Sequence, residues 1–141
     1  MKMARIKIEL PDRFQFSTKI PIRITDLNYG GHVGNDTILS LIHEARVQFL
    51  KNYGYQELDF EGASLIMSDA AIEFKAESFY GDMITAYVAA NNFSRVGFDV
   101  FYKLMKDEII VALAKTGMIC YNYNTKKVVG VPEKAKEKLS I

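Results

Sequence analysis

The spacing of apolar residues divides the first third of the chain into two strands and a long helix. Apolar and polar residues alternate over residues 3–10 and 15–25, which predicts two strands. Pro21 lies inside the second segment, so that strand should lie at an edge of the sheet or be irregular. From Asp36 to about Tyr53, apolar residues recur at helical spacing and form one broad stripe.

The remainder of the chain predicts a sheet and a short terminal helix. Three short turns separate β-rich segments, which favours a four-strand antiparallel meander at about 64–76, 82–93, 95–106 and 109–123. A turn at 124–127 precedes Pro132, where a C-terminal helix should begin. One helix cannot cover both faces of such a sheet. We therefore expect a single α+β domain over residues 1–141, with a curved antiparallel sheet around one helix and a second copy of the chain completing the structure.

One charged residue of the long helix falls within its apolar stripe. Arg46 is either a surface residue whose stem packs on apolar neighbours or the partner of a buried carboxylate, and the pattern leaves both interpretations open. Ser40, His43, Glu44 and Gln48 lie mainly on the opposite face. For His43, an exposed position on the helix surface is the simpler interpretation.

Composition narrows the function classes. The 141 residues are 49% apolar and 25% charged, with a net charge of +1, which is typical of a globular domain and does not favour nucleic-acid binding. No apolar run has the length of a membrane span or a signal peptide. The single cysteine, Cys120, lies in an apolar strand and should be a buried, inert thiol. We expect a cytoplasmic protein without metal ligands of zinc type and without a cofactor.

A glycine-rich segment directly before the long helix is the strongest chemical signal. Between Asp26 and Asp36 the chain carries three glycines, two amide side chains and one of its two histidines. A turn that opens a helix directs free backbone N–H groups toward whatever lies in front of it. Such a site can bind an anion or polarise a carbonyl group that is becoming one.

These residues resemble the hotdog-fold acyl-CoA thioesterases, in particular their 4-hydroxybenzoyl-CoA thioesterase branch. The resemblance rests on four features that span nearly the whole chain in order: Arg23-x-x-Asp26-x-Asn28-x-x-Gly31-His32-Val33-Gly34-Asn35, then Glu44-x-Arg46, then Phe79-Tyr80-Gly81-Asp82, and the ending from Tyr121 to Pro132-Glu133. The glycine–histidine turn is moderately specific, and the later features gain weight from their order.

The resemblance implies a hotdog fold, a homodimer or homotetramer, and hydrolysis of an acyl-CoA thioester, with an acyl carrier protein thioester as the second candidate. It places the start of the helix near Asn35, whose backbone N–H would polarise the thioester carbonyl. It also places Asp26, Gly31, Val33 and Gly34 beside the substrate, with Gly34 allowing close approach of the backbone.

The sequence departs from the family pattern at Asn28. In the branch that it resembles, this position usually holds the catalytic carboxylate, whereas an amide cannot accept a proton at neutral pH. Asn28 and His32 could still position water or substrate, although a histidine in a glycine turn can equally be structural.

Three other carboxylates compete for the role of base. Asp26 could instead pair with a nearby arginine, and Asp36 could simply stabilise the first helical turn. Glu44 lies close to the place where another thioesterase subclass with this fold carries its acid, but it could equally be a surface or interface residue.

The missing acid also keeps a different class of function open. A hotdog protein can bind acyl-CoA without turning it over, as a sensor or accessory subunit. A dehydratase or hydratase on the same fold is a third interpretation, but the acid–histidine patterns typical of those enzymes do not occur in this sequence.

Overall fold

The computed structural model describes residues 4–141, which form a six-stranded sheet, two α-helices and one short 3₁₀ helix. In chain order the elements are β1 (Phe16–Pro21), η1 (Ile24–Asp26), α1 (Asn35–Asn52), β2 (Ser64–Phe74), β3 (Met83–Asn91), β4 (Gly97–Lys106), β5 (Ile109–Asn122), β6 (Lys127–Val128) and α2 (Glu133–Leu139). Within this range neither helix has the length and apolarity needed to cross a membrane.

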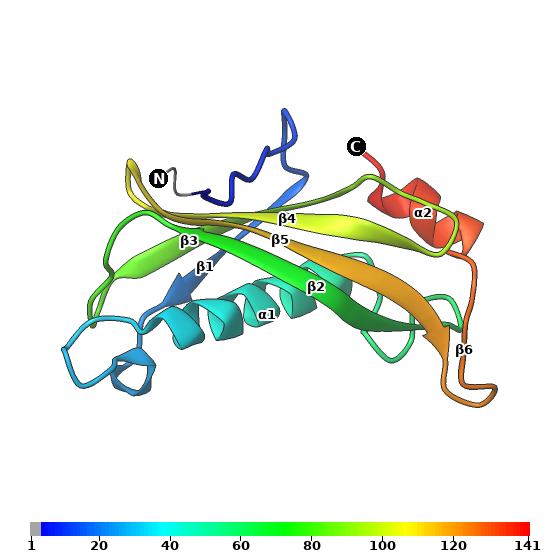
Figure 1. Cartoon of the computed structure of the whole chain (residues 1–141), viewed down its shortest axis with the longest axis horizontal. Coiled ribbons are helices and arrows are strands. Elements are labelled where there is room, and N and C mark those ends of the chain that lie inside the picture. The colour runs from blue at the N-terminus through cyan, green and yellow to red at the C-terminus, as the bar shows by residue number, and fades with distance from the viewer. Residues whose placement is uncertain (1–3) are drawn as a thin grey trace.

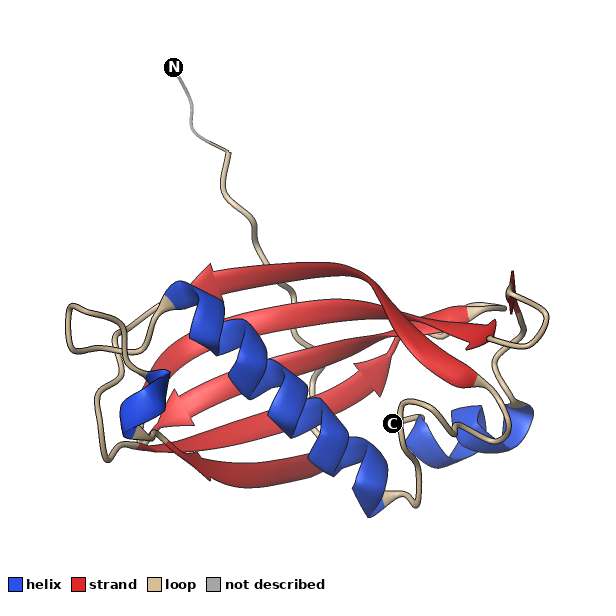
Figure 2. Ribbon diagram, turned by 90° about the horizontal axis from the view of Figure 1, so that it is seen from below, coloured by secondary structure: helices blue, strands red, loops and turns tan. Residues whose placement is uncertain are grey.

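The sheet arches over α1, which crosses its concave side diagonally (Figures 1 and 2). The strand order is β1-β3-β4-β5-β2, every pairing is antiparallel, and the short β6 adds to the end of β5. The N-terminal segment runs over the opposite, convex side. The expected α+β class, with a curved sheet around one central helix, is confirmed.

The expected four-strand meander is wrong in one respect. Strands β3, β4 and β5 follow one another as a meander, but β2 pairs with β5 and not with β3. Residues 75–82 therefore cross the end of the sheet, a distance of about 14 Å over three strand spacings, which a segment of that length spans easily. A short connection does not by itself require the strands that it joins to be neighbours.

The two N-terminal strand predictions are corrected as well. Residue 3 lies outside the described residues, and residues 4–10 form no strand. The apolar residues Ile8 and Leu10 are half-buried without belonging to a strand. The Ile8 N–H donates to the Glu73 carboxylate (2.8 Å) and not to the backbone of a neighbouring strand. The second predicted strand ends at Pro21, where η1 soon follows, but its expected place at a sheet edge is confirmed.

The end of the chain differs from expectation only in detail. The predicted turn at 124–127 lies one residue earlier, at 123–126, because β5 ends at Asn122 and Lys127 belongs to the two-residue strand β6. The predicted C-terminal helix is present, with Pro132 at the cap position immediately before its first residue.

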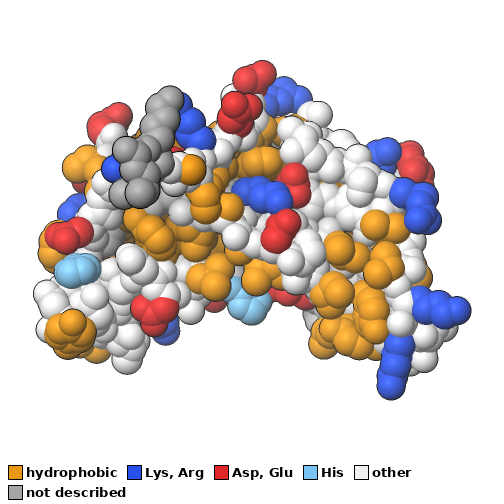
Figure 3. Space-filling view, in the orientation of Figure 1, with side chains coloured by type: hydrophobic (Ala, Val, Ile, Leu, Met, Phe, Trp, Pro, Cys, Tyr) orange, Lys and Arg blue, Asp and Glu red, His pale blue; other side chains and the backbone are white. Residues whose placement is uncertain are grey.

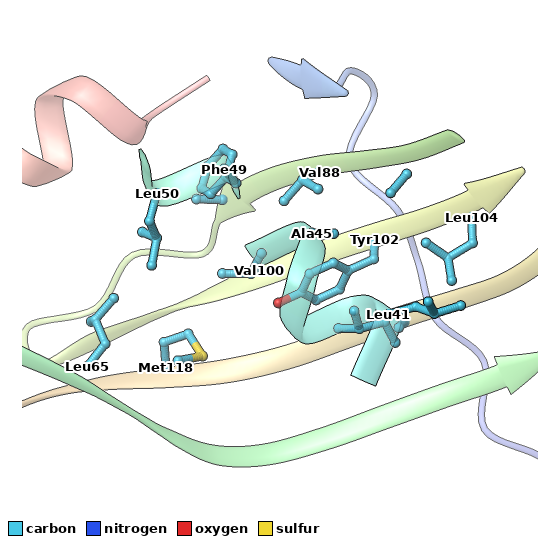
Figure 4. Packing of buried hydrophobic residues seen from close by; sticks show 14 of the residues in the cluster. Leu41, Ala45, Phe49, Leu50, Leu65, Val88, Val100, Tyr102, Leu104 and Met118 are labelled. Atoms are coloured by element: carbon cyan, nitrogen blue, oxygen red, sulfur yellow. The ribbon is translucent and has the colours of Figure 1, made fainter. Parts of the chain in front are cut away.

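The core lies between α1 and the concave face of the sheet. Ile42, Ala45 and Phe49 of α1 are fully buried, and the helix residues point toward side chains from β3, β4 and β5 (Figure 4). Tyr102 of β4 is also fully buried. Burial raises the pKa of the Cys120 thiol to about 11, which agrees with the expectation of an inert cysteine.

Gly97 permits the close pairing of β4 with β5. A Cβ at this position would collide with the backbone carbonyl oxygen of Met118, and backbone cannot move aside as a side-chain end can. We predict that Gly97→Ala lowers the free energy of unfolding by about 1–3 kcal/mol in a urea titration. Gly130→Ala is the matched control, because its nearest neighbour, the Arg95 carbonyl oxygen, is 3.6 Å from the added Cβ. Equal stability of the two variants would contradict the prediction.

Candidate active site

The glycine-rich turn is closed by hydrogen bonds within itself. The Asn28 N–H donates to the His32 carbonyl oxygen (2.8 Å), and the Gly31 N–H donates to that of Asn28 (3.1 Å). The Asn28 side-chain oxygen accepts a further bond from the Gly30 N–H (2.8 Å). Gly31 has a φ of 82°, a left-handed conformation that favours glycine. The turn is therefore a defined loop and not a slack connection.

A second segment holds the turn against the end of the sheet. The Val33 N–H donates to the Ser78 carbonyl oxygen (2.9 Å), and Val33 itself is buried. Just beyond Ser78, the Asp82 carboxylate accepts the Phe79 N–H (2.8 Å) and pairs with Lys106 (3.0 Å). The glycine–histidine turn and the Phe79-Tyr80-Gly81-Asp82 motif are thus neighbours in space. The crossing segment that separates β2 from β3 positions the start of α1.

The first turn of α1 begins with backbone N–H groups that have no hydrogen-bond partner among residues 4–141. Gly34 is the N-cap residue, and its carbonyl oxygen accepts the N–H groups of Thr37 (3.0 Å) and Ile38 (3.2 Å). The N–H groups of Asn35 and Asp36 have no acceptor within the helix, as the geometry of a helix start dictates. A side chain at Gly34 would be crowded, because a Cβ there would lie 2.6 Å from the Asp36 carboxylate.

The two polar side chains of the turn lie next to each other. Asn28 Nδ2 is 3.5 Å from His32 Nε2, and both groups lie at the surface of the turn. His32, Val33 and Asn35 line a cleft of about 260 Å³ whose other wall is formed by Phe74, at the end of β2, and residues 75–78 of the crossing segment. The structure therefore brings Asn28, His32 and the helix start together.

Asp26 faces away from this group. Its side chain is buried and accepts the Arg23 backbone N–H (2.8 Å), and it pairs with the Arg23 guanidinium (3.2 Å). Burial opposes ionisation of Asp26, but the hydrogen bonds and charge of Arg23 outweigh it and hold its pKa below the usual value. Asp26 is the last residue of the 3₁₀ helix η1, and its carboxylate caps the start of that helix by accepting the Arg23 N–H, so it serves as a structural partner.

Glu44 also lies apart from the turn. It accepts a hydrogen bond from Gln48 (2.6 Å), which in turn bonds to Thr18 of β1. Glu44 lines a cavity of about 400 Å³ together with Arg23 and Asp26, on the β1 side of the helix. Of the two helix carboxylates considered, only Asp36 lies at the helix start.

A cluster of polar side chains lies on the β2 side of α1, in a second cleft that is separate from the one beside the turn. Asp36, His43, Arg46 and Glu57 line one cleft of about 320 Å³, which adjoins a larger cavity of about 770 Å³ toward the end of the helix. His43 Nε2 is 2.9 Å from Glu57 Oε1, and Arg46 Nε is 3.5 Å from the same oxygen. Arg46 is 5% exposed, so the sequence alternative in which it partners a carboxylate is the one observed.

Sequence reasoning missed Glu57 altogether and treated His43 as a simple surface residue. Glu57 lies in the loop after α1, fourteen residues from His43, and no local pattern connects the two. The only available signal was the unusual place of Arg46 in the apolar stripe, which required some carboxylate nearby.

Known proteins now place this geometry in a family. Residues 22–139 match the thioesterase-like superfamily. A 1,4-dihydroxy-2-naphthoyl-CoA hydrolase from Microcystis aeruginosa is 31% identical over 118 residues, which cover 82% of this chain and 86% of the relative. The chain belongs to the thioesterase-like superfamily.

Solved structures of thioesterases share the fold of this protein. A 1,4-dihydroxy-2-naphthoyl-CoA thioesterase from Synechocystis superimposes with a TM-score of 0.79 at 20% identity, covering 88% of this chain and 93% of that structure. A gentisyl-coenzyme A thioesterase gives a TM-score of 0.79 at 16% identity, with 89% and 100% covered. The expected hotdog fold and the expected class of activity, thioester hydrolysis, are confirmed.

The Asp26–Arg23 pair generates a pH-dependent prediction. Because the folded-state pKa of Asp26 is lowered, its ionisation stabilises the fold above its ordinary value of 3.8, and this stabilisation is lost as the pH falls through the lowered folded-state pKa. Asp26→Asn keeps an oxygen that can accept the Arg23 N–H but loses the charge that pairs with the exposed Arg23 guanidinium, so it should destabilise the thioesterase by about 0.2–1 kcal/mol at pH 7. In urea titrations the difference between the two proteins should shrink below about pH 4. A difference that stays constant down to pH 2 would contradict this assignment.

Proposed function

We propose that this thioesterase hydrolyses acyl-CoA thioesters, with thioesters of an acyl carrier protein as the second candidate substrate. The unpaired N–H groups at the start of α1 carry the proposal, because they can stabilise the oxyanion that forms when water attacks the thioester carbonyl. Water then adds to the carbonyl carbon, the carbon–sulfur bond breaks, and the thiolate leaves with a proton. The products are a free carboxylic acid and a thiol. The names of the relatives, whose substrates are aromatic acyl-CoA thioesters, support the choice of coenzyme A.

The turn supplies positioning groups and not the base. The side-chain oxygen of Asn28 already accepts a hydrogen bond from the Gly30 N–H, and its side-chain nitrogen lies beside His32. The Asn28 and His32 side chains can hold the attacking water or the substrate. Gly31, Val33 and Gly34 shape the backbone around the carbonyl group of the bound thioester. A cytoplasmic location is part of the proposal, since the single cysteine is buried and reduced.

A homodimer formed along β2 completes the proposal. β2 is an eleven-residue strand at the end of the sheet order, so its outer edge has no partner among the described strands. Hydrophobic side chains gather in patches on the face that β2 crosses (Figure 3). Met67 of this edge is 44% exposed and shares a cleft with Leu39 of α1, which is 38% exposed. A long free edge next to exposed apolar residues is a typical site of strand pairing between copies.

The backbone donor can be removed without removing the helix. Asn35 is the first helical residue, where proline is well tolerated, and Gly34 has the extended conformation that a following proline requires (φ −71°, ψ 154°). We predict that Asn35→Pro lowers kcat for release of free CoA from a panel of acyl-CoAs by about 10²–10³-fold. The matched control is Asn35→Ala, which keeps the N–H and should stay within a few-fold of wild type.

Two outcomes of this assay would count against the proposal. Full activity of Asn35→Pro with unchanged melting temperature would remove the role of the helix start. No release of CoA by the wild-type protein from any substrate, together with thermal stabilisation by acyl-CoA, would instead favour the non-catalytic binding protein that Asn28 leaves open.

The proposed dimer is tested at Leu39. We predict that Leu39→Glu yields monomers in sedimentation velocity and lowers kcat strongly, because two like charges would meet across the interface. Ile109→Glu serves as the control, since Ile109 is 55% exposed at the far end of β5. If Leu39→Glu sediments with the same mass as the wild type, the β2 edge is not the interface.

A further inference from the structure

Arg46 joins the core of the protein to the cleft beside α1. Its Nη1 donates to the Tyr102 hydroxyl (3.1 Å), which is 2.8 Å from the Thr116 hydroxyl in the neighbouring strand. Its Nε lies 3.5 Å from Glu57 without forming a well-aligned hydrogen bond and is buried. Burying a guanidinium costs several kcal/mol of desolvation unless it is paired, and the Glu57 carboxylate is the anionic partner that lies beside Arg46.

The contact with Glu57 determines which ring nitrogen of His43 carries a proton. An ionised carboxylate can only accept hydrogen bonds, so the His43 nitrogen that it contacts, Nε2 at 2.9 Å, is the one that carries a proton. The other ring nitrogen, Nδ1, is then unprotonated in the neutral imidazole and can accept a proton. The His43 side chain is 58% exposed, whereas that of Glu57 is 25% exposed. The exposed His43 ring is thus held on its Nε2 side by Glu57, which in turn contacts the buried Arg46.

We propose that His43 is the general base of this thioesterase and that Glu57 is its positioning residue, an inference that rests on the proposed hydrolysis. His43 Nδ1 takes a proton from water as the water oxygen bonds to the thioester carbonyl carbon. When the tetrahedral intermediate collapses, the carbon–sulfur bond breaks and the same proton passes to the leaving thiolate. Asp36, Arg46 and Glu57 are the charged groups that line the cleft with His43, and Lys51 lines the adjoining cavity.

The base must serve the helix start of a second copy. His43 lies eight residues after Asn35, which is about 12 Å along the helix axis, too far for one water molecule to connect them. In a twofold dimer each contact is made twice, so a residue at the midpoint lies near the axis. The midpoint of Asn35 and His43 is Leu39, the exposed apolar residue that shares a cleft with Met67 of the free edge. Pairing of two β2 edges about this point brings His43 of one copy toward Asn35 of the other.

The first test removes the imidazole and then restores it. We predict that His43→Ala lowers kcat by about 10²–10⁴-fold, the usual contribution of a general base, and that added imidazole recovers part of the activity. The melting temperature should hardly change, since His43 is exposed. Glu44→Ala is the matched control, the next residue of the helix on its β1 side, and it should keep wild-type kcat without any response to imidazole. Near-normal turnover by His43→Ala would overturn the assignment.

The second test asks which copy supplies the base. Mixed dimers of His43→Ala and Asn35→Pro chains contain one site with both groups intact, so refolding an equal mixture should restore about a quarter of wild-type activity. Each variant alone should be nearly inactive. If the two groups acted within one chain, no mixed dimer would contain an intact site and mixing would restore nothing.

The role of Glu57 is tested by Glu57→Gln. An amide can donate to His43 Nε2 and so favour the imidazole tautomer whose free nitrogen faces the wrong way. We expect kcat to fall with little change in KM, and only this result supports a positioning role. A rise in KM alone would assign Glu57 to substrate binding. Loss of Asn35→Pro sensitivity, in contrast, would count against thioester hydrolysis at the helix start and not against His43 specifically.

Discussion

Every feature of the candidate site follows from the way in which α1 is held. One face of the helix is buried against the concave side of the sheet through Ile42, Ala45 and Phe49. Burial of three such side chains stabilises the fold by several kcal/mol, which fixes the helix far more firmly than its intrinsic propensity could. Because the sheet covers only this face, the start of the helix and its opposite face stay free. The polar groups that could do chemistry therefore have a rigid support without being buried themselves.

The buried Arg46 complicates this picture in an informative way. It occupies a position in the apolar stripe where leucine would pack without any cost of desolvation. Its charge is balanced by Glu57 from a loop and by the Tyr102 hydroxyl from the sheet, so three distant segments must agree before the cation is satisfied. Burial raises the pKa of Tyr102, which keeps its hydroxyl neutral as a hydrogen-bond partner. An arrangement that stabilises the fold no better than a leucine would is more readily explained by what it holds at the surface, which is His43.

Much of the fold could be predicted from the sequence, because apolar periodicity reports burial directly. It gave the boundaries of α1 and of β2 to β5 to within a few residues. It failed over residues 4–10, where alternation reflects packing of Ile8 and Leu10 and not strand pairing, and it failed for the neighbour of β2. Strand order depends on which edges meet after the chain has crossed the sheet, and no residue in 75–82 encodes that crossing locally. For the site, the sequence identified the helix start but not Glu57, whose contact with His43 exists only in three dimensions.

The amide at position 28 and the pair at His43 answer the same chemical need. Hydrolysis requires a proton acceptor near the carbonyl, and the turn cannot supply one once its acid is an amide. Asn28 keeps the hydrogen bonds that shape the turn, because its side-chain oxygen still accepts the Gly30 N–H as a carboxylate would. An amide in place of a carboxylate at position 28 therefore leaves this hydrogen bond of the turn in place. A negative charge, moreover, would have stood beside the developing oxyanion and opposed the donors of α1. Moving the base to the His43 imidazole removes that repulsion while keeping a proton acceptor within reach across the proposed dimer.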